Sequence, residues 1–173
     1  MNTLTDADVY VEDKLFATLD TSTRLLKKIN QKKIPQQVLI SDTVGFIRNL
    51  PHDLIVSFKS TLAEVIESDI LLHVIDISSE NFTEQMKVVE ETLSELYKTP
   101  KPVIMVFNKV DKLADSDEME MLTELKAQYP NAVFISAKRG INLTALKEKI
   151  IDIINRELSE TEIKIPIEKI TIT

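Results

Sequence analysis

The stretch "PVIMVFNKVD" (residues 102–111) decides how this sequence is interpreted. Its apolar run predicts a strand over residues 102–108, buried within a sheet. The polar residues Asn108, Lys109 and Asp111 come at the end of that run and directly after it. Ligands bind at the carboxyl ends of the strands in open parallel sheets. A binding site is therefore expected at this turn.

Apolar strand patterns and amphipathic helix patterns alternate on both sides of this stretch. Strands and helices at these intervals are typical of βαβ units and a parallel sheet, which predicts an α/β fold. Strands are predicted over residues 38–42, 70–76, 102–108 and 132–136, and helices over residues 51–68, 81–98, 117–129 and 142–158.

Three local expectations follow from the same patterns. Residues 23–30 and 36–42 are predicted to form an antiparallel hairpin. Met119 is predicted to face the core together with Leu122 and Leu125, and His73 is predicted to be a hydrogen-bonded side chain within its strand. Residues 1–158 are assigned to one domain, and residues 159–173 to a linker that leads into an edge strand or a further segment.

Composition excludes several classes of function. The sequence has 173 residues and a net charge of -7, which suits one soluble domain and disfavours DNA as a partner. It has no cysteine, which excludes disulfides, thiolate catalysis and cysteine zinc sites. No apolar run approaches the roughly 20 residues of a membrane helix, so a cytoplasmic protein without a membrane segment is expected.

The four residues "NKVD" (residues 108–111) suit recognition of guanine. Guanine presents N1-H and a 2-amino group side by side, and the single carboxylate of Asp111 can accept both hydrogen bonds. Adenine lacks this pair of donors, so it would leave buried polar groups unpaired. Asn108 can bond the base and hold the loop, and the methylene chain of Lys109 can lie over the purine face with its ammonium near the ribose. The alternative for this motif is a helix-capping turn after a strand.

Two further motifs follow predicted strands. In "DTVG" (residues 42–45), Asp42 can hold Mg²⁺ through a water, and the backbone of Gly45 can approach a terminal phosphate. In "SAK" (residues 136–138), the backbone N-H groups of Ser136 and Ala137 can meet guanine O6. Each motif is weak alone, but three motifs in this order at strand ends favour a guanine-nucleotide site.

The wording of "KLFATLD" (residues 14–20) and "SDTVGFIRNLP" (residues 41–51) resembles the HflX family of ribosome-associated GTPases, and the resemblance covers essentially the whole chain. It implies a three-layer, Rossmann-like GTPase fold with a mostly parallel sheet. It also implies GTP hydrolysis with Mg²⁺ and a role in ribosome splitting or rescue on the large ribosomal subunit. In that family Thr18 corresponds to the residue that coordinates Mg²⁺ and senses the γ-phosphate. The GTP-binding residues implied or inferred are Phe16, Ala17, Thr18, Leu19, Asp20, Asp42, Thr43, Val44, Gly45, Asn108, Lys109, Val110, Asp111, Ser136, Ala137 and Lys138.

The sequence departs from the family pattern in two places. Phe46 occupies the position where many GTPases carry a water-orienting glutamine, which predicts slow intrinsic hydrolysis and activation by a partner. The sequence has two glycines, Gly45 and Gly140, so it contains no GxxxxGK[ST] phosphate-binding loop. We therefore expect the P-loop and the central strand before it to be missing, and the strands that end at Asp42 and Asp76 to lack a neighbour.

Two alternatives to an active GTPase are open at this point. The chain can be a non-catalytic remnant of such a domain that acts as a binding module, because it lacks the P-loop. It can also be an unrelated α/β enzyme that uses Asp42 or Asp76, although the ordered guanine motifs argue against this. Tight binding of GDP would oppose the remnant, and binding of ATP without GTP would favour the unrelated enzyme.

Overall fold

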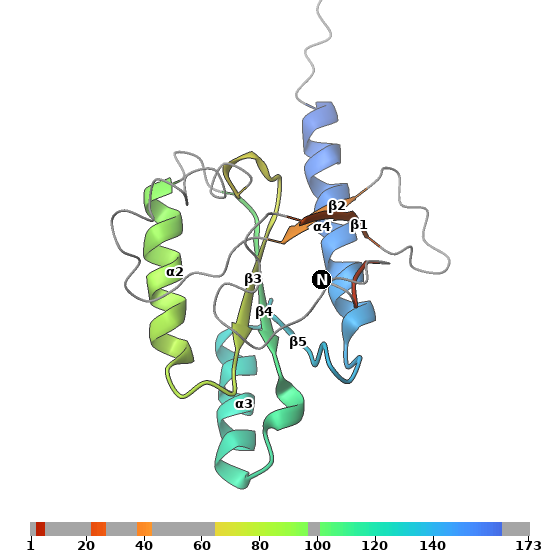
Figure 1. Ribbon diagram of the computed structural model, residues 1–173. Helices are drawn as coiled ribbons and strands as arrows, with labels where there is room; N and C mark the ends of the chain where they lie inside the picture. Colours follow the sequence, from red (N-terminus) through yellow and green to blue (C-terminus); the bar gives the residue numbers. More distant parts are fainter. Residues whose placement is uncertain (1–2, 6–21, 27–37, 43–64, 97–100, 164–173) are drawn as a thin grey trace, which may run out of the picture.

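The computed structural model describes residues 3–5, 22–26, 38–42, 65–96 and 101–163 (Figure 1). The described elements are, in chain order, β1 (Ser22–Leu25), β2 (Leu39–Asp42), β3 (Leu71–Asp76), α2 (Phe82–Leu96), β4 (Val103–Asn108), the 3-10 helix η1 (Val110–Lys112), α3 (Ser116–Gln128), β5 (Val133–Phe134) and α4 (Leu143–Ile163). Of the helix predicted over residues 51–68, only the end lies in the described part, where residues 65–67 are helical.

Strands β3, β4 and β5 form a parallel sheet in the order β3-β4-β5. The register pairs Asp76 with Asn108 and Phe107 with Phe134, so the carboxyl ends of the strands lie at one edge. Helices connect each strand to the next, as a parallel sheet requires. The predicted α/β fold is confirmed.

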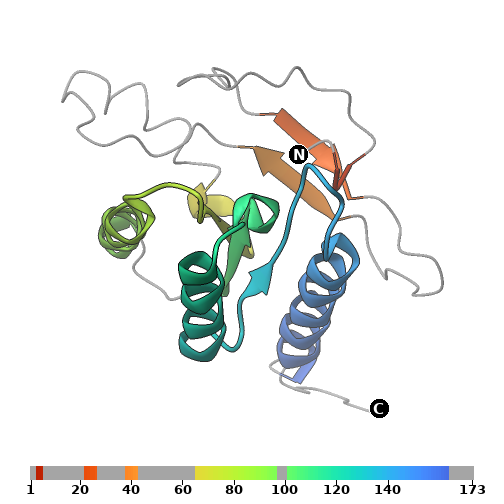
Figure 2. The same ribbon diagram turned by 90° about the horizontal axis from the view of Figure 1, so that it is seen from below.

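The sheet has a hydrophobic core on each face. Alternate residues of β4 enter the two cores: Phe107 packs with residues of α2 and α3, whereas Ile104 and Val106 pack with residues of α4. Figure 2 shows α3 and α4 on opposite sides of β5. The molecule is therefore built in three layers, with β4 as its most deeply buried strand, because Val106 and Phe107 are completely inaccessible to solvent.

Strands β1 and β2 form a separate antiparallel pair, which confirms the predicted hairpin. The apolar run of residues 38–42 is typical of a buried strand, but in the structure this strand is only half-buried. Leu39 is 63% exposed, whereas Val38 and Ile40 pack against the core beside α4. The pair packs through one face only, so alternate side chains of β2 remain in water. Within the described residues, β2 and β3 share no ladder.

Helix α3 differs from its prediction at Met119, which is 51% exposed. The packed stripe consists of Met121, Leu122 and Leu125, which are three and four residues apart and share one face. Asp115 begins the helix with a capping box, in which its side chain accepts from Glu118 N-H and Glu118 bonds back. Met119 lies away from the packed face.

Helix α4 continues to Ile163 rather than ending at Leu158. Residues 159–163 contain no glycine or proline, and the next proline is Pro166. Nothing in this segment therefore stops the helix. The linker predicted over residues 159–173 begins within the helix, and residues 164–173 lie outside the described part.

His73 also departs from its prediction. Its Nδ1 atom is buried and has no hydrogen-bond partner among the described residues. Burial lowers the pKa of His73 below its ordinary value of 6.5, because the charged imidazolium loses its hydration.

Among the described helices, none combines the length and the apolar character needed to cross a membrane.

Candidate functional site

Three segments that follow parallel strands meet at one edge of the sheet. The backbone N-H of Ile77, after β3, donates to the carbonyl of Asn108 at the end of β4 (3.2 Å). On the other side, Val110 N-H donates to the carbonyl of Ile135, after β5 (3.2 Å). The strand-end site, defined here as Asp76, Ser78, residues 108–111 and residues 136–139, is therefore built on backbone that the sheet itself fixes.

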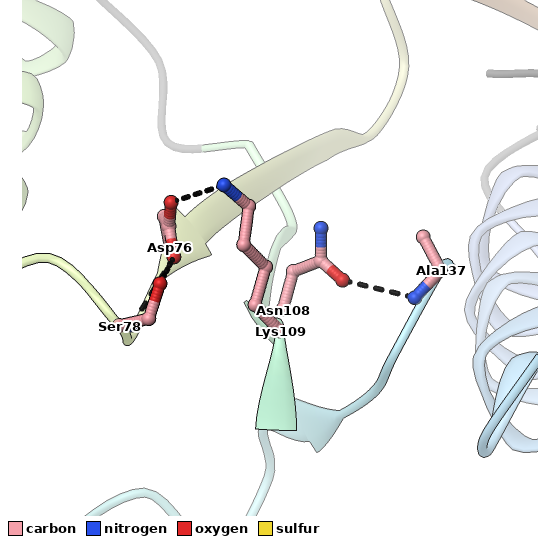
Figure 3. A network of polar contacts seen from close by, with 5 residues as sticks. All are labelled: Asp76, Ser78, Asn108, Lys109 and Ala137. Atoms are coloured by element: carbon pink, nitrogen blue, oxygen red, sulfur yellow. Dashed lines mark hydrogen bonds and ion pairs between the residues drawn. The ribbon is translucent and has the colours of Figure 1, made fainter. Parts of the chain in front are cut away.

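Asn108 connects the "NKVD" and "SAK" segments directly. Its Oδ1 accepts a hydrogen bond from the backbone N-H of Ala137 (3.0 Å), as Figure 3 shows. The two segments are 29 residues apart in the sequence. This contact joins the two segments, while the bond from Asn108 to the base stays a prediction.

The two backbone donors predicted for guanine O6 are both engaged within the protein. Ala137 N-H donates to Asn108, and Ser136 N-H donates to the carbonyl of Ile141 (3.3 Å). That second bond belongs to a short bridge which folds residues 136–141 back on themselves, with Gly140 in the left-handed region at φ 73°. The sequence pattern identified this loop but not its internal hydrogen bonds.

Asp111 lies in η1 and its side chain is exposed to solvent. Hydrogen bonding from the Ser136 side chain, together with the positive charges of Arg139 and Lys138, holds the pKa of Asp111 below its usual value. The Ser136 side chain is completely buried, and its Oγ accepts the backbone N-H of Arg139 (3.0 Å). Asp111 is therefore an exposed, ionised acceptor.

The side chain of Lys109 reaches across to the neighbouring strand end, and the contact with the purine predicted for it stays a prediction. Its Nζ forms an ion pair with Oδ2 of Asp76 (2.6 Å), across the edge from β4 to β3. The other carboxylate oxygen, Oδ1, accepts from both the N-H (3.1 Å) and the hydroxyl (2.7 Å) of Ser78. Burial raises the pKa of Asp76, but the bonds from Lys109 and Ser78 outweigh burial and lower it. The sequence pattern places Asp76 at a strand end, but it does not indicate the pairing with Lys109.

The structure does not place the remaining predicted site residues at this edge of the sheet. Asp42 ends β2, in the other sheet, and is partly buried. Residues 16–20 and 43–45 lie outside the described residues, so the roles predicted for Thr18 and Gly45 stay predictions. Over the described ranges, no three His, Asp or Glu side chains gather as a metal site.

Comparisons with known proteins show which family and which relatives this chain resembles. The model of the family described as "50S ribosome-binding GTPase" matches residues 1–109. A curated relative, GTPase HflX of Caldanaerobacter subterraneus subsp. tengcongensis, is 45% identical over 164 residues, which cover 94% of this chain and 34% of the relative. The chain spans about a third of the length of the curated relatives that head the comparison.

Two solved structures share the fold. One is a GTP-binding protein from Sulfolobus solfataricus in complex with GDP, with a TM-score of 0.62 and 28% identity, covering 78% of this chain and 44% of that one. The other is Era in complex with MgGDPNP and a segment of 16S ribosomal RNA, with a TM-score of 0.64 and 25% identity, covering 87% of this chain and 50% of that one.

Proposed function

Because this chain belongs to the family of 50S ribosome-binding GTPases, within its HflX group, we propose that it is the guanine-recognising part of a GTP-hydrolysing protein. The observation that carries the proposal is the hydrogen bond between Asn108 and Ala137, which joins the segment that contains the exposed carboxylate of Asp111 to the segment after β5. A carboxylate at this position suits the paired N1-H and 2-amino donors of guanine and cannot satisfy adenine in the same way.

Around that carboxylate, the other strand-end residues take supporting roles. Asn108 holds the loop that contains Ala137, and the methylene chain of Lys109 offers an apolar surface to the purine ring. Because the N-H groups of Ser136 and Ala137 are engaged, we assign the next one, that of Lys138, to guanine O6. Guanosine and GDP contain the same base, so both would bind through these same contacts.

Phosphate binding and hydrolysis are assigned to residues of the other motifs. Thr18 and Asp42 would hold Mg²⁺, and the backbone of Gly45 would contact the γ-phosphate. One partly buried carboxylate at a strand end fits Mg²⁺, which keeps several waters and takes few protein ligands. The bound ion would neutralise charge on the phosphates. With Phe46 in place of a glutamine, hydrolysis would depend on activation by a partner.

The partner that we propose is the large ribosomal subunit, in the cytoplasm, with splitting or rescue of ribosomes as the outcome. The description of the matching family and the names of the relatives support this assignment. The test is sedimentation of the protein with purified large subunits in the presence of GDP or a non-hydrolysable GTP analogue. Association that is equal with both nucleotides, or absent with both, would oppose a GTP-regulated role.

A non-catalytic binding module is the second candidate for these 173 residues, which contain no GxxxxGK[ST] sequence. A polypeptide of these 173 residues would hold nucleotides mainly through the base, so its affinity would be weak and its hydrolysis impaired. Measured GTP turnover above the buffer background would eliminate this candidate. Turnover that appears only with ribosomes would support the activated GTPase.

The base contact is tested by titrating the protein with GDP and with ADP while following backbone amide shifts by NMR. We expect GDP to shift residues 108–111 and 136–139 and ADP to leave them unchanged. Asp111→Ala should abolish the GDP response, because it removes the acceptor for both base donors. Glu124→Gln is the matched control, since Glu124 is an exposed carboxylate on α3. Equal responses to GDP and ADP would refute guanine recognition.

A further inference from the structure

The ion pair between Asp76 and Lys109 connects two strand ends of the site. Lys109 Nζ and Asp76 Oδ2 are 2.6 Å apart, and the two side chains are 34% and 37% exposed. Asp76 is the register partner of Asn108, the residue before Lys109. The lysine side chain therefore runs sideways along the edge of the sheet from β4 to β3 (Figure 3).

Both ends of this side chain are held. At one end, the backbone of Lys109 has φ 72° and ψ 30°, a left-handed conformation that residues with a side chain seldom adopt. At the other end, the N-H and hydroxyl of Ser78 bind Oδ1 of Asp76 and so fix the carboxylate that receives the ammonium. A lysine side chain normally rotates about several bonds, but here its course is set from backbone to tip.

We propose that Asp76 is a positioning residue of the guanine site, which holds the methylene chain of Lys109 as a preformed wall for the purine ring. This inference rests on the proposed function, because it takes the site to bind guanine. Asp76 and Ser78 have no part in the base contacts or the phosphate contacts proposed above, so this role in ligand binding is additional to them. Asp76 acts through Lys109 and does not itself touch the base.

The physical effect is preorganisation. A mobile lysine side chain would lose rotamer freedom when the base settles against it, whereas a held side chain has already lost that freedom. Ordering one such side chain corresponds to about a two- to ten-fold change in affinity. The loss on removing the carboxylate should therefore be of that size, and it should be the same for guanosine and for GDP. Preference for guanine over hypoxanthine should not change, because Asp111 sets it.

The test is a double-mutant cycle on the 173-residue chain, with guanosine and GDP titrated by NMR. The four proteins are wild type, Asp76→Asn, Lys109→Met and the double variant. Lys109→Met keeps an apolar chain and removes the ammonium. We expect Asp76→Asn to weaken both ligands and to have no further effect once Lys109 is methionine, because residues that act as one unit are non-additive. Ser78→Ala should weaken both ligands by less, and Glu120→Gln, at an exposed site on α3, should match wild type.

A second measurement reports on the lysine without any ligand. Reductive ¹³C-methylation of the lysines gives an NMR signal for Lys109, assigned by its loss in Lys109→Met. In wild type that signal should titrate at higher pH than in Asp76→Asn, because the carboxylate stabilises the ammonium. Identical titration in the two proteins would overturn the proposal.

The possible failures can be told apart. If wild type binds neither guanosine nor GDP, the proposed function fails and this inference falls with it. If wild type binds both but Asp76→Asn changes neither affinity, or its effect adds fully to that of Lys109→Met, the positioning role is wrong while guanine recognition stands. If the loss of affinity in Asp76→Asn is explained entirely by a lower melting temperature, Asp76 only stabilises the fold and the positioning role is wrong.

Discussion

Asn108 Oδ1 and the backbone N-H of Ala137 are joined by a hydrogen bond of 3.0 Å, so the segments after β4 and β5 form a single binding surface. The bond also engages the backbone N-H of Ala137, which was predicted from the sequence to donate to guanine O6. A side chain at the end of one strand thus sets the position of a loop at the end of the next. The base site depends on this contact even if the side chain never touches the nucleotide.

The first prediction concerns this contact. Asn108→Ala should abolish GDP binding and destabilise the fold by about 1 kcal/mol, because one hydrogen bond is lost and the N-H of Ala137 is left without its acceptor. Urea denaturation measures the stability, and amide NMR measures the binding. Asn131→Ala, in an exposed turn, is the control and should change neither. Full GDP binding by Asn108→Ala would show that the loop is held by other contacts.

The second prediction exchanges the base preference. Asp111→Asn should lose GDP and gain XDP, since xanthine has a carbonyl where guanine has its 2-amino group, and an asparagine amide offers a donor for it beside an acceptor for N1-H. The measurement is a competition titration of GDP against XDP. Asp117→Asn, exposed on α3, should keep the wild-type preference. If Asp111→Asn still favours GDP, another group reads the base.

Sequence patterns were sufficient for the parallel sheet and its strand ends. The runs that end at Asp76 and Asn108 predicted two strands of a parallel sheet, and these strands pair in register. Patterns alone could not show that Lys109 reaches Asp76 or that the Ser136 side chain is completely buried, because both features depend on how residues far apart in the chain pack together. The exposure of Met119 has the same origin: helical spacing allowed two stripes on α3, and tertiary packing selected the one that contains Met121.

The third prediction concerns Lys101, which lies just before β4. Its Nζ donates to the carbonyls of Val65 (3.4 Å) and Ser68 (2.5 Å) and to that of Ile66. These carbonyls end the described helical turn before β3, so the ammonium acts as a cation at a helix C-terminus. Lys101→Met should destabilise the protein by about 1 kcal/mol, a value reduced by partial exposure.

Urea denaturation and hydrogen exchange test this role of Lys101. Amides in the turn around residues 65–68 should exchange faster in Lys101→Met, while those of β5 should be less affected, because the lost contacts are local. Lys112→Met, at an exposed position in η1, is the control for removing a positive charge. If both variants have the stability of wild type, the three carbonyl contacts contribute nothing measurable.

The last prediction follows from His73, whose pKa is lowered by burial and whose Nδ1 lacks a partner among the described residues. In the unfolded chain His73 binds a proton more readily than in the folded protein, so the free energy of unfolding should rise with pH across the interval from the lowered pKa up to 6.5. His73→Leu replaces the imidazole with an apolar side chain of similar size and removes this proton linkage. Urea denaturation at pH about 5.5 and about 7.5 should therefore show a smaller loss of stability on acidification for His73→Leu than for wild type. Parallel pH dependence in the two proteins would mean that His73 takes up its proton without unfolding, through a rotamer that exposes its ring to water.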